Sequence, residues 1–207
     1  MIVIIDYGVG NLFSLKSSLQ AIGREVTITG DKEIIKRSDK IILPGVGAFC
    51  DSAQKLKESG LDILIKEEVK NGKSLMGICL GMQLLFEKSY EYGHHTGLGL
   101  IKGHVKPIVE VIPKELKIPH IGWNALHFTQ NKEKNPIFKY TKEKDCVYFV
   151  HSYYATDCND AVIATTEYGS ELTAAVAYNN VYGCQFHPEK SGHVGLNILK
   201  AFCEIGD

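Results

Sequence analysis

The chain lacks an excess of charge of either sign. Its 207 residues include 23 lysines and arginines and 24 aspartates and glutamates, which gives a formal net charge of −1 at pH 7. Proteins that bind nucleic acids or anionic membrane surfaces generally do so through a clustered basic face. The near balance of charge disfavours both, so we expect no nucleic acid and no membrane as a partner.

Long apolar runs are also missing. The first apolar run, residues 2–5, ends at Asp6 and is too short for the core of a signal peptide. No run approaches the roughly 18 apolar residues that a membrane-spanning helix needs. These absences predict a soluble protein of the cytoplasm.

Paired cysteines, repeats and linkers are absent as well. None of the six cysteines belongs to a C-x-x-C pair, which argues against a disulfide framework or a zinc ribbon and fits a reducing compartment. No internal repeat and no proline- or serine-rich stretch marks a domain boundary. We therefore expect a single domain over residues 1–207, a length at which one hydrophobic core suffices.

The first half of the chain alternates short β-branched runs with longer amphipathic segments. The runs predict strands at residues 2–5, 26–29, 41–43 and 74–78, the third ended by Pro44. The segments predict a helix capped by Asn11, then helices at 32–37, at 48–69 with a break at Gly60, and at 80–86. Such alternation is typical of an α/β fold with a mostly parallel sheet and helices on both faces.

From about Gly97 onward the pattern changes to short runs of valine, tyrosine and phenylalanine. They predict strands at residues 147–155, 161–166, 173–178 and 181–186, the last two joined by a tight turn at Asn179 and Asn180. A helix at residues 196–202 should close the chain and pack on the sheet. The second half thus predicts an added antiparallel β section.

The sharpest local signal surrounds Cys79. Gly77-Ile78-Cys79-Leu80-Gly81 lies where a predicted strand meets a predicted helix, with cysteine in the nucleophile position of a G-x-nucleophile-x-G elbow. Free N–H groups at the start of the helix favour the reactive thiolate. A random intracellular cysteine is usually structural, but this setting favours a nucleophile.

A nucleophilic cysteine needs a base, and Phe186-His187-Pro188-Glu189 offers one. Residues i and i+2 of an extended chain point to the same side, so Glu189 can accept a hydrogen bond from one nitrogen of His187 and leave the other for the thiol. His-Pro-Glu taken alone also occurs in ordinary surface turns. The other histidines, such as His94 and His95, show no metal-ligand spacing.

Two glycine-rich stretches follow predicted strands. Residues 44–47 (PGVG) could bring a backbone N–H to join that of Leu80 in an oxyanion hole, although this stretch taken by itself favours a plain glycine-rich turn. Residues 6–13 (DYGVGNLF) partly match G-x-G-x-x-G, but Phe13 replaces the third glycine and no acidic residue ends the second strand. Dinucleotide binding is therefore disfavoured, and the absence of G-K-[ST] excludes a P-loop.

Together these motifs resemble the triad-type, class I glutamine amidotransferase family over essentially the whole chain. Gly77–Gln83 is similar to the family's nucleophile motif and Phe186–Glu189 to its His–Glu motif. Within the family, further stretches resemble the glutaminase subunits of imidazole glycerol phosphate synthases: residues 6–11 (DYGVGN), 44–49 (PGVGAF), 119–124 (PHIGWN), 148–154 (YFVHSYY) and 186–191 (FHPEKS). Correspondence is weakest between Ser89 and Gly103, where only Glu91 aligns well.

The resemblance implies a flavodoxin-like amidotransferase domain that hydrolyses glutamine through a cysteinyl thioester, with no cofactor and no metal. It implies the catalytic residues Cys79, His187 and Glu189 and an oxyanion hole from the backbone N–H groups of Val46 and Leu80. It further implies glutamine contacts from Gly47, Gln83, Glu91, Ser152 and Tyr153, with backbone amides acting at the last two.

The resemblance also implies a partner. Ammonia would pass to a cyclase subunit, a (β/α)-barrel, that makes imidazole glycerol phosphate and AICAR in histidine biosynthesis. Asn11, Trp123 and Lys190 match positions that face this heterodimer partner, although a core tryptophan and an ordinary surface lysine explain two of them as well. Two alternatives stay open: a glutaminase subunit of another ammonia-using synthase, and a non-catalytic flavodoxin-like binding module with a structural Cys79.

Overall fold

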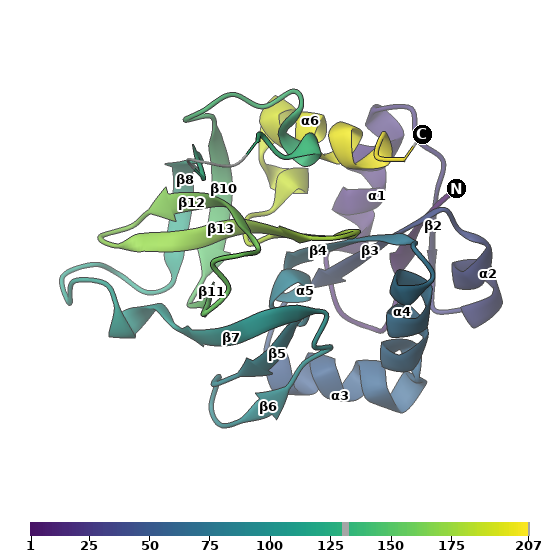
Figure 1. The fold of residues 1–207 in the computed structure, drawn as a ribbon, viewed down its shortest axis with the longest axis horizontal. Helices are drawn as coiled ribbons and strands as arrows, with labels where there is room; N and C mark the ends of the chain where they lie inside the picture. The colour runs from purple at the N-terminus through teal and green to yellow at the C-terminus, as the bar shows by residue number, and fades with distance from the viewer. Residues whose placement is uncertain (130–132, 207) are drawn as a thin grey trace.

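The computed structural model describes residues 1–129 and 133–206, and a central eight-stranded sheet dominates them (Figure 1). Five strands of this sheet are parallel: β2 (Val26–Thr29), β1 (Ile2–Ile5), β3 (Lys40–Gly45), β4 (Ser74–Cys79) and β14 (Val181–Cys184). Three antiparallel strands extend it: β13 (Glu171–Tyr178), β12 (Val162–Glu167) and β9 (His127–Phe128). The predicted α/β fold with a mostly parallel sheet is confirmed.

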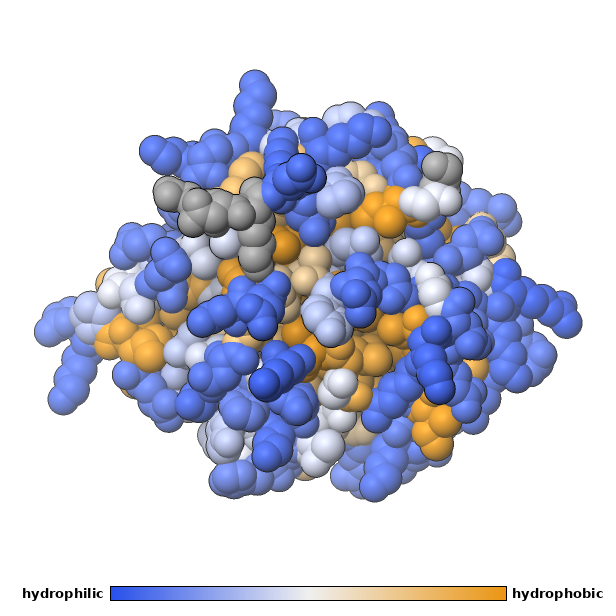
Figure 2. Space-filling view, viewed as in Figure 1, coloured by the Kyte–Doolittle hydropathy of each residue, from blue (hydrophilic) through white to orange (hydrophobic). Residues whose placement is uncertain are grey.

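Helices cover both faces of the sheet, because the alternating strand residues are apolar on each side. Val3 and Ile5 of β1 pack in one cluster with residues of α2 (Lys32–Arg37), α3 (Phe49–Ser59) and α4 (Leu61–Lys70). Ile2 and Ile4 pack in the other cluster with residues of α1 (Leu12–Ala21) and α6 (Gly192–Cys203). Hydrophilic side chains cover most of the face seen in Figure 2, with small apolar patches between them.

Two smaller sheets form the added β section. One pairs β8 (His120–Ala125) with β10 (Cys146–His151) in antiparallel register. The other has the order β11 (Tyr153–Thr156), β7 (Ile101–Pro107), β5 (Phe86–Ser89) and β6 (His95–Thr96). In the part of the chain that the structure describes, three 3₁₀ turns are also present: η1 (Ile108–Glu110), η2 (Pro136–Phe138) and η3 (Pro188–Lys190). The added section is antiparallel except where β5 runs parallel to β7.

Three predicted elements differ from the structure. The helix predicted at residues 80–86 is α5 (Leu80–Gln83) alone, because Phe86 pairs with Ile101 and begins β5. The strand predicted at 147–155 divides at Ser152 into β10 and β11, which belong to different sheets. Pro44 does not end β3: it lies beyond the residues of β3 that pair with β1, so its missing N–H breaks no bond of that ladder.

Other boundaries hold more closely. Gly60, at φ 65°, separates α3 from α4 as predicted. Asn11 occupies the N-cap position of α1, but its side chain makes no capping hydrogen bond, so that part of the prediction is wrong. Over residues 1–129 and 133–206, none of the helices combines the length and the apolar character that crossing a membrane requires.

Candidate active site

Cys79 ends β4 at a tight elbow. Its backbone has φ 54° and ψ −114°, a left-handed conformation that non-glycine residues rarely adopt and that is typical of functional sites. The flanking positions need glycine because a side chain would not fit there, not because their backbone dihedrals are unusual. A Cβ on Gly81 would lie 1.9 Å from the carbonyl oxygen of Leu43, and one on Gly77 would lie 2.7 Å from the nitrogen of Met82. The elbow therefore requires glycine on both sides of the cysteine.

His187 and Glu189 follow β14, the strand next to β4 in the sheet. Nδ1 of His187 lies 2.8 Å from Oε1 of Glu189, and both side chains are almost fully buried. Burial lowers the pKa of His187, but hydrogen bonds to Cys79 and Glu189 outweigh burial and raise it to about 9. The thiol, the imidazole and the carboxylate thus lie in the order that a nucleophile, a base and an orienting carboxylate would need.

The backbone around His187 is fixed by Ser191 and Tyr148. The Ser191 hydroxyl donates to the carbonyl oxygen of His187 at 2.7 Å and accepts from the N–H of Tyr148 at 2.9 Å. The N–H of His187 donates to the Tyr148 carbonyl oxygen, also at 2.9 Å. These bonds attach the triad segment to β10.

A buried amide network surrounds the Cys79 sulfur. Nε2 of Gln185 lies 3.8 Å from Sγ of Cys79, and its Oε1 accepts from Nε2 of Gln83 at 3.0 Å. Gln83 donates a second bond from the same amide to the carbonyl oxygen of Tyr153 at 3.2 Å. Both amide hydrogens of Gln83 are therefore used within the protein, which leaves its Oε1 as an acceptor.

The glycine-rich segment at the end of β3 borders the sulfur. Val46 is 43% exposed and Gly47 has φ 89°, while the Tyr7 hydroxyl donates to the Pro44 carbonyl oxygen at 2.8 Å. Glu91 accepts a hydrogen bond from the N–H of Phe49, and burial raises the pKa of this carboxyl. Leu80 begins α5, so its N–H lies among the helix N–H groups that have no intrahelical partner.

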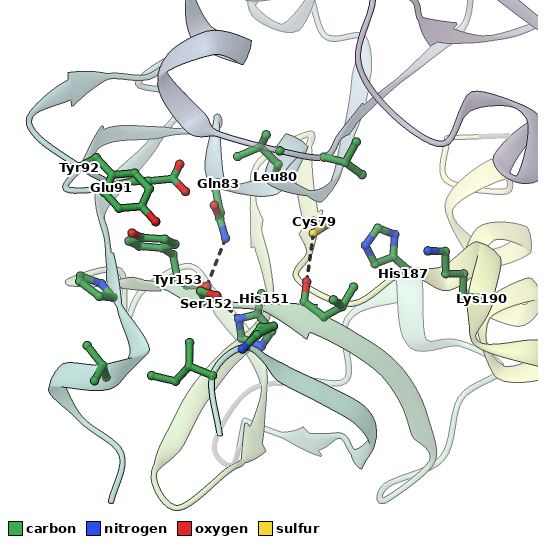
Figure 3. A pocket seen from close by; sticks show the side chains of 17 residues that line it. Cys79, Leu80, Gln83, Glu91, Tyr92, His151, Ser152, Tyr153, His187 and Lys190 are labelled. Atoms are coloured by element: carbon green, nitrogen blue, oxygen red, sulfur yellow. Dashed lines mark hydrogen bonds between the residues drawn. The ribbon is translucent and has the colours of Figure 1, made fainter. Parts of the chain in front are cut away.

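These side chains line a pocket of about 540 Å³ (Figure 3). It contains all the residues for which the sequence predicted a role in catalysis, in the oxyanion hole or in substrate contact, except that Glu189 lies behind His187. The pocket also contains Lys190, which lies beside His187. A thiol, an imidazole with a bound carboxylate and nearby backbone donors can together perform acyl transfer.

Trp123 lies outside the pocket, on the exposed side of the β8–β10 pair. It is 56% exposed, which argues against a core tryptophan. Its ring centroid lies 5.9 Å from that of Tyr148, opposite it on β10, and Nζ of Lys190 lies 5.9 Å from the Tyr148 ring. Asn11 is half-buried between β1 and α1.

Sequence reasoning missed two residues, one beside the Cys79 sulfur and one in the pocket wall. Gln185 touches the sulfur and lies two residues before His187. The extended chain that the sequence predicted from His187 to Glu189 is wrong, because Pro188–Lys190 form the 3₁₀ turn η3, and it is this turn that brings Glu189 to His187. His151 also lines the pocket, with its Nδ1 2.8 Å from the Tyr153 carbonyl oxygen. Among the residues described, no group of three or more His, Cys, Asp or Glu side chains is arranged to hold a metal ion.

Comparisons with known proteins agree with this geometry. The sequence profile of the family "Glutamine amidotransferase class-I" matches residues 3–204. The chain is 50% identical over 206 residues to the imidazole glycerol phosphate synthase subunit HisH of Caldanaerobacter subterraneus subsp. tengcongensis, covering 99% of this chain and 98% of the relative. Identity to the HisH subunit of Lactococcus lactis subsp. lactis is also 50%, over 98% of each chain.

Solved structures show the same fold. The structure of PurLQS from Thermotoga maritima matches with a TM-score of 0.75 and 22% identity, covering 98% of this chain and 96% of that one. The profile match over nearly the whole chain and the 50% identity decide the family. The chain is a class-I glutamine amidotransferase and belongs, within that family, to the HisH subunits of imidazole glycerol phosphate synthase.

Proposed function

We propose that this chain hydrolyses glutamine to glutamate and ammonia at the pocket that holds Cys79. The observation that carries the proposal is the arrangement in one pocket of Cys79 at the strained elbow and of the buried His187, whose Nδ1 lies 2.8 Å from Oε1 of Glu189. The family match supports the same reaction. We further propose that residues 1–207 form one amidotransferase domain.

The steps follow from the positions of the groups. The Cys79 thiol gives its proton to His187, and the sulfur attacks the side-chain amide carbon of glutamine while the carbonyl π electrons move to the oxygen. His187 gives a proton to the nitrogen as the C–N bond breaks, which releases ammonia and leaves a thioester. Water, deprotonated by His187, attacks the thioester carbon. As the carbonyl reforms the C–S bond breaks, glutamate is released, and the sulfur takes the proton back from His187 to restore the thiol.

Backbone donors would stabilise the two oxyanions. We assign this role to the N–H groups of Val46 and Leu80, which come from the two segments that border the sulfur. One such donor is worth on the order of 3 kcal/mol, or about a hundredfold in rate. Ionisation of a thiol that is a few per cent thiolate at pH 7 gains only about thirtyfold. The geometry of the oxyanion hole is thus the larger contribution.

Substrate contacts are assigned to the rest of the pocket. The free Oε1 of Gln83 suits a donor on the substrate, and the Glu91 carboxylate suits an α-amino group. Gly47 and the backbone amides at Ser152 and Tyr153 complete the set. Each of these residues lines the same cavity as the sulfur.

A cyclase subunit, a (β/α)-barrel, is the proposed recipient of the ammonia, in the step of histidine biosynthesis that forms imidazole glycerol phosphate and AICAR. The curated relatives are named as subunits of imidazole glycerol phosphate synthase, which supports this acceptor over another synthase. Lys190 borders the pocket, and the half-buried Tyr148 lies between it and the exposed Trp123. We assign these residues and Asn11 to the interface.

Glutamate formation, measured with and without the cyclase and its nucleotide ligand, tests the proposal. We expect little activity from the isolated chain, strong stimulation by the loaded cyclase, and complete loss in Cys79→Ser with unchanged partner binding. High activity that ignores the cyclase would contradict the partner assignment. Unchanged hydrolysis by Cys79→Ser would contradict the nucleophile.

A further inference from the structure

Two buried histidines connect the pocket to strand β8. His151 of β10 lies opposite His120 of β8, and its Nε2 lies 3.0 Å from Nδ1 of His120. The far nitrogen of His151, Nδ1, lies 2.8 Å from the Tyr153 carbonyl oxygen, and Nε2 of His120 lies 2.8 Å from Oδ1 of Asn124. A continuous line of three short contacts therefore runs from Tyr153 to Asn124.

The planes of both rings are restrained by packing. His120 is fully buried and stacks between Phe149, at 5.0 Å between centroids, and Tyr168, at 4.1 Å. His151 is 5% exposed. Because neither ring can turn freely, the positions of their protons decide which contacts are hydrogen bonds.

The two neutral rings carry one proton fewer than the three contacts need to be hydrogen bonds. The Tyr153 oxygen only accepts, and Oδ1 of Asn124 only accepts while its Nδ2 donates to the Glu167 carbonyl oxygen at 3.1 Å. Three hydrogen bonds then need three ring protons, but two neutral imidazoles carry two. Burial lowers the pKa of both rings, that of His151 to about 4, so the pair is neutral at pH 7.

The contact that lacks a ring proton should be the one whose loss costs the least free energy. A gap between the two rings would leave two buried lone pairs facing each other at 3.0 Å. A gap at Tyr153 would leave a ring nitrogen and a carbonyl oxygen, both acceptors, 2.8 Å apart in a part-buried contact, and a peptide carbonyl cannot turn to become a donor. At the Asn124 end the hydrogen bond from Asn124 to Glu167 is exposed, so water can replace it. The Asn124 amide can then turn and donate to Nε2 of His120, which needs no ring proton there. Both rings therefore carry their proton on Nδ1.

We propose that His151 and His120 are positioning residues that fix the Tyr153 peptide for glutamine binding. His120 donates to Nε2 of His151, which keeps the proton of His151 on Nδ1, where it donates to the Tyr153 carbonyl oxygen. That same oxygen accepts from Gln83, so its placement also sets the Gln83 amide beside Gln185 and the Cys79 sulfur. The effect on glutamine binding rests on the proposed function of this pocket. The placement of the ring protons does not depend on that function.

The first test observes the protons directly. In ¹⁵N-labelled full-length chain at pH 7, long-range ¹H–¹⁵N spectra should show the protonated-nitrogen shift at Nδ1 and the bare-nitrogen shift at Nε2 in both His151 and His120. A proton on Nε2 of His151, or a charged ring at pH 7, would overturn the proposal. This measurement is independent of glutaminase activity.

The second test compares two variants of similar size in complex with the cyclase. His151→Asn can keep an N–H close to the Nδ1 position, whereas His151→Leu removes it. We expect the KM for glutamine to rise roughly five- to tenfold in His151→Leu, with a smaller change in kcat, and to stay within about twofold of the wild type in His151→Asn. Equal KM values in the two variants would reject the positioning role.

Failure of the proposed function gives a different result. If the wild-type complex does not hydrolyse glutamine, the KM comparison has no baseline and the proposed function is wrong, while the spectra still decide the proton placement. If the wild-type complex is active and the two variants behave alike, the positioning role alone is wrong.

Discussion

His187 and Glu189 are joined by one carboxylate oxygen only. Oε1 of Glu189 lies 2.8 Å from Nδ1 of His187, whereas the buried Oε2 has no hydrogen-bond partner in residues 1–129 and 133–206. The whole orienting effect of the carboxylate therefore passes through one bond, and the rotamer of Glu189 decides whether the imidazole presents Nε2 to the sulfur.

Glu189→Gln should lower kcat at least a hundredfold. An amide can donate as well as accept, so it can turn its N–H toward His187 and favour the tautomer with the proton on Nε2, which cannot act as the base. The measurement is glutamate formation in the cyclase complex. An unchanged melting temperature in the variant would exclude unfolding as the cause, and an activity loss below tenfold would contradict the orienting role.

The raised pKa of His187 predicts a pH-dependent stability. Because the folded pKa is about 9 and the unfolded value about 6.5, the protonated ring stabilises the fold fully below pH 6.5, and this contribution is lost as the pH rises through 9. Its size is on the order of 3 kcal/mol. Urea unfolding should show that the free energy of unfolding falls more between pH 6.5 and pH 9.5 in the wild type than in His187→Gln. An equal fall in both proteins would contradict the stabilising role of the protonated ring.

Cysteine reactivity should separate the elbow from the other thiols. Burial raises the pKa of Cys158 to about 11 and raises that of Cys184, whereas Cys146 is exposed. A small general thiol reagent should therefore react with Cys146, while a glutamine-analogue electrophile should label Cys79 selectively. Peptide mapping by mass spectrometry gives the site of labelling. Equal labelling of several thiols by the analogue would favour a binding module.

Gly81→Ala should be far more damaging than its control, Gly72→Ala. A Cβ at position 81 would lie 1.9 Å from the Leu43 carbonyl oxygen, so β3 or the elbow must move. At Gly72 the space is open and only the φ of +96° opposes alanine, at a cost of about 1–2 kcal/mol. Soluble yield and urea midpoints of both variants check this, and similar midpoints would show that the elbow tolerates a side chain.

Trp123→Ala should weaken partner binding without unfolding the chain. The ring is 56% exposed and packs on Tyr148, so its removal leaves no core cavity. As an aromatic anchor it should raise the Kd for the cyclase about tenfold to a hundredfold. Tyr178→Ala, at a 52% exposed position near the β13–β14 turn, is the control and should leave the Kd unchanged. Equal Kd values for both variants would remove Trp123 from the interface.

The parts of the site set by local sequence were predictable. The elbow around Cys79 and the contact of His187 with Glu189 depend on neighbours within a few residues, and the structure has both, although the 3₁₀ turn η3 makes the contact rather than the extended chain that was predicted. The contact between His120 and His151 depends on the register of β8 against β10, which local sequence does not determine. The helix predicted over 80–86 failed for the same reason, since Phe86 is held in β5 by Ile101, a distant residue.

The pocket draws its walls from separate sheets: Cys79 ends a strand of the central sheet, His151 ends β10, and Tyr153 begins β11. A glutamine molecule bound in this pocket would act as a non-covalent crosslink between these sheets, in addition to the hydrogen bonds that already join them. Its binding free energy would then oppose the local opening of the two small sheets. Substrate occupancy would thus appear as slower amide exchange in β10 and β11, far beyond the atoms that react.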